Sequence, residues 1–130
     1  MHEEHQFKSK TGLRRILNAM RYSLEGFKAA YQFEAAFRQE LVLAVMLIPM
    51  ALLLPVTPTQ SAFMIAAVTL VLIVELINSA IEATVDRISL ERHELAKRAK
   101  DVGSAAVMLA ILNCVVVWGL VLYDSLRSSS

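Results

Sequence analysis

The stretch from Thr69 to Arg87, TLVLIVELINSAIEATVDR, constrains the fold more than any other part of the sequence. It begins as an apolar run typical of a membrane-spanning helix. It then introduces polar side chains at steps of three, four and four residues: Glu75, Asn78, Glu82 and Asp86. At about 100° per residue, these four side chains fall within roughly 80° on one helical face. A carboxylate in a membrane segment is costly and usually lines a polar pathway or a functional site. We therefore expect the chemistry of this protein on this face.

The distribution of hydrophobic residues indicates an all-α integral membrane protein. Of the 130 residues, 56% are hydrophobic, and they occur in blocks rather than in the pattern of a soluble helical domain. At this length we expect one membrane domain covering residues 1–130. The formal net charge of +1 gives no indication of nucleic-acid binding. The polar N-terminus lacks an apolar h-region, so no cleaved signal peptide is predicted.

Residues 12–32 are expected to form an amphipathic helix at the membrane surface. Apolar side chains recur there at steps of three and four residues, while basic and other polar side chains cover much of the remaining surface. A basic amphipathic helix beside membrane spans is typical of a helix that lies against an anionic leaflet. Such a helix either only anchors the chain or also forms part of the wall of a site.

Three transmembrane helices are expected at about residues 36–56, 61–88 and 98–124. The first contains an uncharged run of about 16 residues from Leu41 to Val56, or roughly 24 Å of helix. With the preceding turn, this run is long enough to cross a bilayer core of about 30 Å. The third begins with small residues between Gly103 and Ala110, which allow a neighbouring helix to approach closely.

The lysine and arginine side chains predict the orientation in the membrane. Seven of them precede the uncharged run that begins at Leu41, five lie in the charged connection from Arg87 to Lys100, one follows Tyr123, and none lies between Leu41 and Asp86. The positive-inside rule therefore places the N-terminus in the cytoplasm and the C-terminus outside. Because three spans do not easily enclose a polar site, we expect Glu75 and Asn78 to face another subunit of a homo-oligomer.

The carboxylates expected at the cytoplasmic surface suit a site for a metal ion and a phosphate group. The sequence contains no Walker loop, GxGxxG or HExxH motif, so side chains would have to hold any nucleotide. Glu34 and Glu82 could share Mg²⁺, because this ion favours one or two carboxylates together with phosphate oxygens. Exposed charges at helix ends would have the same spacing. Arg98, Lys100 and Asp101 also suit such a site, although a solvated charge run has the same composition.

Glu75 is expected to lie about 10 Å deeper along the helix than Glu82. Removal from water would suit it to general-base catalysis. The alternative is a buried carboxyl group that is hydrogen-bonded between subunits. Taken alone, His93 is better explained as a solvated side chain among charged residues. Asn113, in the middle of the third span, is most simply explained by an interhelical hydrogen bond.

Several segments, in one order and at one spacing, resemble the prokaryotic integral-membrane diacylglycerol kinase family. They are EAAFRQE (34–40), VELINSAIEATVDRI (74–88), HEL followed by RAKD (93–95 and 98–101) and GSAAV (103–107). The resemblance extends from Arg15 to about Tyr123. It implies a homotrimer in the bacterial inner membrane, with a surface helix and three spans in each subunit. It also implies transfer of the γ-phosphate of MgATP to the hydroxyl of diacylglycerol, which gives phosphatidic acid at the inner leaflet.

The resemblance further implies roles for individual residues. Glu75 would be the general base, Asn78 would lie near the reacting hydroxyl, and Glu34 and Glu82 would bind Mg²⁺. The residues around the nucleotide would be Arg15, Tyr22, Glu34, Glu82, Glu91, Arg92, His93, Lys100 and Asp101. The residues near the lipid would be Arg15, Lys28, Ala36, Phe37, Arg38, Gln39, Glu40, Glu75 and Ser104. Arg92 departs from the family, in which an aromatic residue is common at this position. Leu24 and Tyr31 stand where tryptophans often occur.

Two other functions stay open at this point. A polyprenol kinase of the same family would use the same chemistry on undecaprenol. A small transporter or membrane assembly module would use Glu75 as a proton or cation site. Such a module would not need Glu34, Glu82, Lys100 and Asp101 at one membrane surface.

Overall fold

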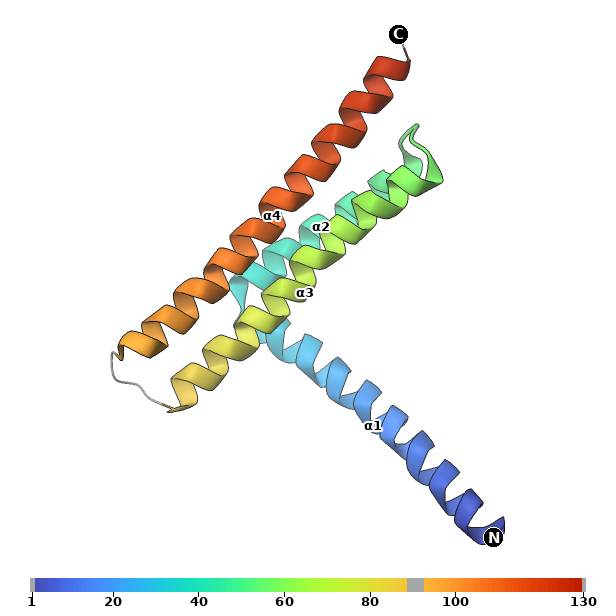
Figure 1. Ribbon diagram of the computed structural model, residues 1–130, viewed down its shortest axis with the longest axis vertical. Helices are drawn as coiled ribbons and strands as arrows, with labels where there is room; N and C mark the ends of the chain where they lie inside the picture. The colour runs from blue at the N-terminus through green and yellow to red at the C-terminus, as the bar shows by residue number, and fades with distance from the viewer. Residues whose placement is uncertain (1, 89–92, 130) are drawn as a thin grey trace. The chain divides into compact units, whose positions relative to one another are not determined.

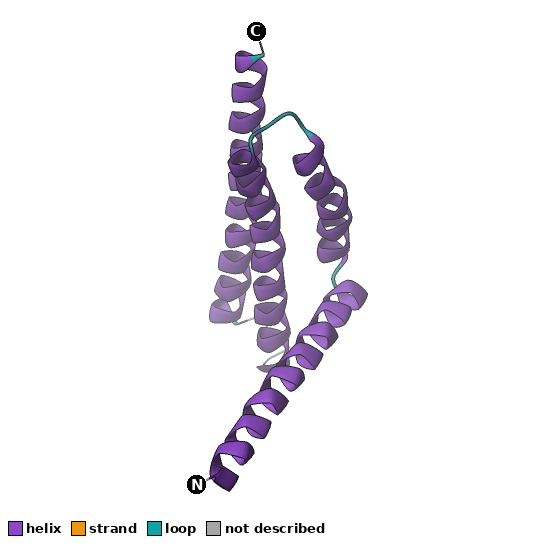
Figure 2. Cartoon of the chain, turned by 90° about the vertical axis from the view of Figure 1, so that its right-hand side faces the viewer, coloured by secondary structure: helices purple, strands orange, loops and turns teal. Residues whose placement is uncertain are grey.

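The computed structural model describes residues 2–88 and 93–129, with side chains described from residue 11 onward. Four helices account for nearly all of these residues (Figures 1 and 2). They are α1 (His2–Phe33), α2 (Ala35–Leu53), α3 (Pro58–Ile88) and α4 (Glu94–Ser128). The last three are long and apolar enough to cross a membrane. The prediction of an all-helical chain with three helices able to span a membrane is confirmed.

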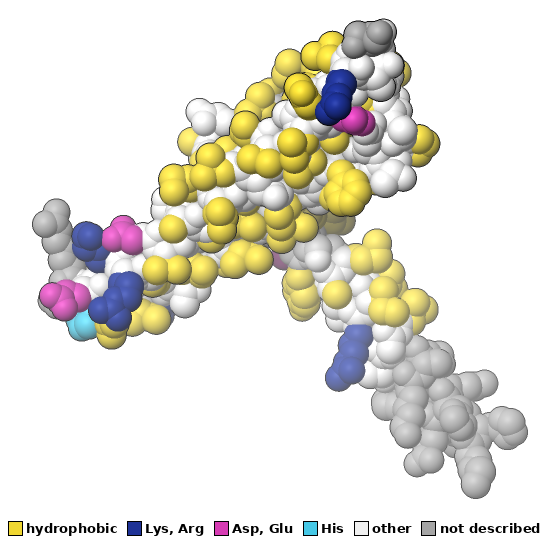
Figure 3. Space-filling view, turned by 45° about the horizontal axis from the view of Figure 1, so that its top comes forward, with side chains coloured by type: hydrophobic (Ala, Val, Ile, Leu, Met, Phe, Trp, Pro, Cys, Tyr) yellow, Lys and Arg dark blue, Asp and Glu magenta, His cyan; other side chains and the backbone are white. Residues whose placement is uncertain are grey.

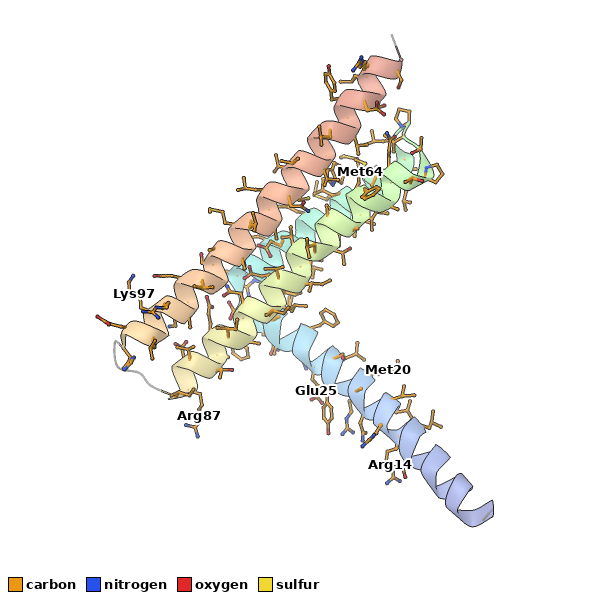
Figure 4. All side chains as sticks on the ribbon, viewed as in Figure 1. Arg14, Met20, Glu25, Met64, Arg87 and Lys97 are labelled. Atoms are coloured by element: carbon orange, nitrogen blue, oxygen red, sulfur yellow. The ribbon has the colours of Figure 1, made fainter. Side chains whose placement is uncertain are left out.

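The chain divides into two compact units, Met1–Glu34 and Ala35–Ser130, and each is described by itself. The first unit consists of α1. Its described side chains are mostly exposed, including large apolar ones such as Leu13, Leu17 and Met20, the last of which is labelled in Figure 4. Beyond the helix end, the Glu34 N–H donates to the carbonyl of Ala30 at 2.9 Å.

The second unit begins with α2, whose sequence is uncharged after Glu40. Pro49 lies within the helix, about one turn before its end. The N–H of Leu54 donates to the carbonyl of Met50 at 3.0 Å and closes the last turn. A short connection then leads into α3.

α3 begins at Pro58, earlier than the predicted start at residue 61, because Thr57 and Gln60 form a capping box. The Thr57 hydroxyl oxygen accepts from the Gln60 N–H at 3.1 Å, and the Gln60 side-chain oxygen accepts from the Thr57 N–H at 3.0 Å. These two bonds satisfy N–H groups that have no partner within a helix. Pro58, in the first helical position, has no N–H to satisfy and already has a helical φ.

α3 is the central helix of the second unit and packs against both α2 and α4 (Figure 1). Near the α2–α3 connection, Ala51 of α2, Met64 of α3 and Val121 of α4 form a small buried core. The buried Ser61 hydroxyl donates to the carbonyl of Ala51 at 2.7 Å, and the Trp118 indole N–H donates to that of Met64 at 3.1 Å. Each of these bonds joins two helices, so they fix the packing at this end.

Charged side chains lie at both ends of the second unit and are separated by an apolar surface (Figure 3). At the end near the α2–α3 connection, Asp124 accepts from the Gln60 amide at 2.8 Å. At the opposite end, Arg87 of α3 and Lys97 of α4 are labelled in Figure 4. The described part of the second unit therefore has the charge distribution of a multi-pass membrane protein.

Candidate active site

The polar row of α3 runs from the interior of the second unit to its surface. Glu75 and Asn78 are buried, with only 5% and 7% of their surface exposed. Glu82 is half-buried and Asp86 is exposed. α3 is continuous through all four residues, so they follow one helical face at the predicted spacing. This arrangement gives a path of carboxylates from an apolar interior to the charged end of the unit.

A second carboxylate reaches this row from α2. Glu40 lies close enough to Glu75 for the two side chains to interact electrostatically. Its Oε2 atom is buried and has no hydrogen-bond partner among the described residues. Phe37, one turn earlier on α2, is only 2% exposed. Two acidic side chains from different helices thus lie at the deep end of the row.

Asn78 connects the deep end of the row to Glu82. Its Nδ2 donates to Oε1 of Glu82 at 3.4 Å, a long hydrogen bond between side chains four residues apart. Its Oδ1 is buried and has no hydrogen-bond partner among the described residues, as is also the case for the Ser79 hydroxyl. The Asn78 carboxamide lies against Gly103 of α4, which is itself buried.

At the surface end, the row meets charged side chains from α4. Lys100 Nζ lies 2.6 Å from Oδ1 of Asp86, and Lys100 also interacts electrostatically with Glu82. Lys97 pairs with Asp101 along α4 at 2.9 Å. Both pairs are well exposed, so they contribute little to stability and mainly orient their side chains.

The remaining predicted residues occupy several environments. His93 is the N-cap of α4, where its Nδ1 accepts from the Leu95 N–H at 3.1 Å. Glu91 and Arg92 lie outside the described residues. The residues expected near the lipid are mostly at the surface of the second unit: Arg38 is half-buried, and the exposed ones are Ala36, Gln39 and Ser104.

The predicted residues of the first unit are also accessible. Those exposed on α1 are Arg15, Tyr22 and Lys28, and the half-buried Glu34 follows that helix. Arg21 lies over the Tyr22 ring, with its Cζ 5.7 Å from the ring centroid. The structure therefore brings together Glu40, Glu75, Asn78, Glu82 and Lys100 within the second unit.

The expectation that Glu75 and Asn78 face another subunit is wrong. Both side chains are more than nine-tenths buried within a single chain. Gly103 allows α4 to approach Asn78 closely, and Glu40 of α2 is near enough to Glu75 to interact with it electrostatically. Glu75 and Asn78, the deep end of the polar row, are thus buried by helices of one chain, and Gly103 leaves room for the Asn78 side chain.

Comparisons with known proteins agree with the resemblance seen in the sequence. Residues 21–122 match the model of the prokaryotic diacylglycerol kinase family. A diacylglycerol kinase of Pseudomonas aeruginosa is 60% identical over 116 residues, which cover 89% of this chain and 94% of that protein. Diacylglycerol kinases of Escherichia coli K12 and Haemophilus influenzae are 50% and 49% identical over 88% and 87% of this chain, and over 93% and 96% of their own lengths. The chain belongs to the prokaryotic diacylglycerol kinase family.

As a member of this kinase family, the chain is an enzyme that uses ATP. Among the described residues, no three His, Cys, Asp or Glu side chains are grouped so that they could hold a metal ion. Mg²⁺ needs only one or two carboxylates when phosphate oxygens supply other ligands. Glu82 fits this need, because it is half-buried and, within the described part of the chain, its Oε1 accepts one long hydrogen bond, from Asn78.

Two residues of this kinase family member have structural roles that its sequence did not reveal. Asp86 shares the polar face, but its pairing with Lys100 depends on how α4 packs against α3. Gly103 was noted only as one of several small residues, whereas the structure places it directly against Asn78. The sequence shows Asp86 on the polar helical face and Gly103 among small residues. It does not show that Lys100 and Asn78 are their partners.

Proposed function

We propose that this enzyme transfers the γ-phosphate of MgATP to the hydroxyl of diacylglycerol, giving phosphatidic acid and ADP. The main support is the polar row of α3, in which the buried Glu75 lies two turns from Glu82 and the surface. A lipid hydroxyl approaches from the membrane and a nucleotide from water, so a row between the two suits this reaction. The relatives named diacylglycerol kinase favour this lipid over undecaprenol.

In the proposed reaction, Glu75 is the general base. Its carboxylate accepts the proton of the acceptor hydroxyl while the hydroxyl oxygen forms a bond to the γ-phosphorus. The bond from the γ-phosphorus to the bridging oxygen of the β-phosphate breaks, and ADP leaves with that electron pair. A carboxylate removed from water has a high affinity for a proton, as this step requires. Asn78, one turn further along α3, would lie near the same hydroxyl.

The phosphate-binding part of the site would lie at the charged end of the second unit. Phosphoryl transfer depends mainly on positioning and charge neutralisation, and bound Mg²⁺ would supply part of the latter. Glu82, together with Glu34, would hold the ion. Lys100 and Asp101 would contact the nucleotide, as would His93, Arg15 and Tyr22. The segment from Ala36 to Glu40, together with Lys28 and Ser104, would contact the lipid.

We further propose that the enzyme is a homotrimer of the bacterial inner membrane, with its N-terminus in the cytoplasm. The distribution of lysine and arginine supports this orientation. α1 would lie as an amphipathic helix on the cytoplasmic leaflet, since its exposed apolar side chains need a partner other than water. The large apolar side chains exposed on α4, such as Leu109 and Val116, would face lipid or neighbouring subunits.

The proposal is tested by offering the purified protein a choice of lipid. The protein in mixed micelles receives MgATP with diacylglycerol, with undecaprenol, or with neither. We expect phosphatidic acid and ADP in equal amounts with diacylglycerol and no ADP without lipid. Preferential phosphorylation of undecaprenol would instead identify the enzyme as an undecaprenol kinase of the same family. A lack of product with both lipids would contradict the proposal.

A further inference from the structure

Of the four glycines, Gly103 alone lies so close to a neighbouring side chain that a Cβ atom would not fit. A Cβ atom built at this position would overlap Oδ1 of Asn78 and lie 3.2 Å from its Cγ. The same construction at Gly12, Gly26 and Gly119 meets no atom within 4 Å. The tight contact at Gly103 therefore reflects the site and not a general property of glycines in these helices.

The hydrogen bond to Glu82 determines which way the Asn78 carboxamide points. An ionised carboxylate only accepts hydrogen bonds, so the amide must present its NH₂ group to Glu82. Its oxygen then faces Gly103. This oxygen is buried and has no hydrogen-bond partner among the described residues. It lies where one Cα–H bond of Gly103 points, which permits only a weak C–H···O contact.

We propose that Gly103 is a positioning residue that sets the orientation of the Asn78 carboxamide and, through it, of Glu82. This inference rests on the proposed function, in which Glu82 binds Mg²⁺. Any side chain at position 103 would push the carboxamide away from α4 and rotate its NH₂ group relative to Glu82. The bond between them is already 3.4 Å long, so a shift of a few tenths of an ångström would break it.

A simpler role for Gly103 would be to let α3 and α4 pack closely, without any effect that passes through Asn78. The two roles differ in what happens when Asn78 is shortened. If Gly103 acts through Asn78, Gly103→Ala adds nothing once Asn78→Ala has removed the carboxamide. If Gly103 acts only through helix packing, the two substitutions act independently and their effects multiply.

The test measures metal binding and turnover in Gly103→Ala, Asn78→Ala and the double variant. Gly119→Ala is the matched control, because it lies on the same helix and a Cβ there meets open space. Mn²⁺ serves as a paramagnetic probe of the metal site, titrated in the presence of a non-hydrolysable ATP analogue. The Mg²⁺ concentration that gives half-maximal phosphorylation of diacylglycerol is measured in parallel, as is the thermal unfolding midpoint.

Both single substitutions should weaken Mn²⁺ binding and raise the Mg²⁺ requirement by about tenfold, as loss of a residue that orients a metal ligand does. The double variant should match Asn78→Ala, and Gly119→Ala should match the wild type. Multiplied effects in the double variant, or unchanged Mn²⁺ binding in Gly103→Ala, would overturn the inference.

Two further outcomes keep the inference separate from the proposed function and from folding. If the wild type phosphorylates no lipid, the proposed function fails, whereas Mn²⁺ binding still tests the link between Gly103 and Asn78. If the Gly103→Ala single variant does not fold, the double variant tests the inference in its place, because it lacks the carboxamide that the new Cβ atom would overlap. A folded double variant with the properties of Asn78→Ala supports the inference, and an unfolded one contradicts it.

Discussion

Lys100 of α4 and Asp86 of α3 form an ion pair in which Nζ lies 2.6 Å from Oδ1. The pair joins the last turns of α3 to the beginning of α4, and Lys100 also interacts electrostatically with Glu82. Since both side chains are about half exposed, the pair is expected to orient Lys100 more than to stabilise the fold.

Replacement of Asp86 by Asn should therefore impair nucleotide binding while leaving the thermal unfolding midpoint nearly unchanged. Lys100 would lose the partner that directs it toward the proposed phosphate site. We expect the KM for MgATP to rise by roughly threefold to tenfold, or about 0.7–1.4 kcal/mol, because Lys100 keeps its charge and loses only its orientation. Asp86→Glu, which keeps a carboxylate, should restore most of the affinity. An unchanged KM in Asp86→Asn would show that Lys100 needs no such partner.

Thr57→Ala should lower stability without changing turnover. The substitution removes the hydroxyl that caps α3, and such losses typically cost about 1 kcal/mol. Thermal unfolding in detergent measures the effect as a lower midpoint. Thr59→Ala is the matched control, because Thr59 is exposed and is the second residue of the same helix. Equal midpoints for the two variants would mean that the capping box does not limit stability.

Replacement of Glu34 or Glu82 by Gln should raise the Mg²⁺ concentration needed for half-maximal turnover. If the two carboxylates hold one ion, the double variant should be far less impaired than the product of the two single effects, because they act as a unit. The measurement is a Mg²⁺ titration at saturating ATP and lipid. Unchanged titrations in both single variants would assign these residues a structural role.

Mixing of inactive subunits tests whether an active site is shared in the proposed trimer. Glu75, Glu82 and Lys100 belong to the second unit, whereas Glu34 is the last residue of the first, so the mixture asks whether Glu34 acts with Glu75 of its own chain or of another subunit. Chains carrying Glu75→Gln would be reassembled with chains carrying Glu34→Gln. A shared site should restore about one quarter of wild-type activity, because intact residues meet at one in four interfaces of a randomly mixed ring.

Each parent reassembled with itself provides the background rate in this experiment. A mixture that stays at the background rate would show that Glu34 and Glu75 act from the same chain. The trimer itself would be unaffected by that result, since its support is the resemblance to the family and not the shared site.

The sequence predicted the number and type of membrane helices because their apolar runs are long and their charges lie at the ends. The predicted start of α3 is three residues too late, since the prediction follows the apolar run and does not include the capping box of Thr57 and Gln60. A boundary of this kind depends on two local side-chain bonds that apolar periodicity does not report.

Prediction of the site was limited by tertiary packing. The spacing of Glu75, Asn78 and Glu82 on one face followed from helical geometry alone. Their enclosure within one chain did not, because it depends on Gly103 lying opposite Asn78. The small residues of the third span predicted close helix packing but not which helix would pack there. Likewise, the electrostatic interaction of Glu40 with Glu75 depends on the packing of α2 on α3.

The central claim is that Glu75 is the base of a diacylglycerol kinase, and the turnover number of Glu75→Gln tests it most directly. The variant keeps the size of the side chain but cannot accept the hydroxyl proton. It should fold and bind MgATP as the wild type does, while kcat falls at least about a hundredfold. Glu25→Gln, at an exposed glutamate of α1, is the control and should keep wild-type turnover. Turnover near that of the wild type in Glu75→Gln would contradict the claim.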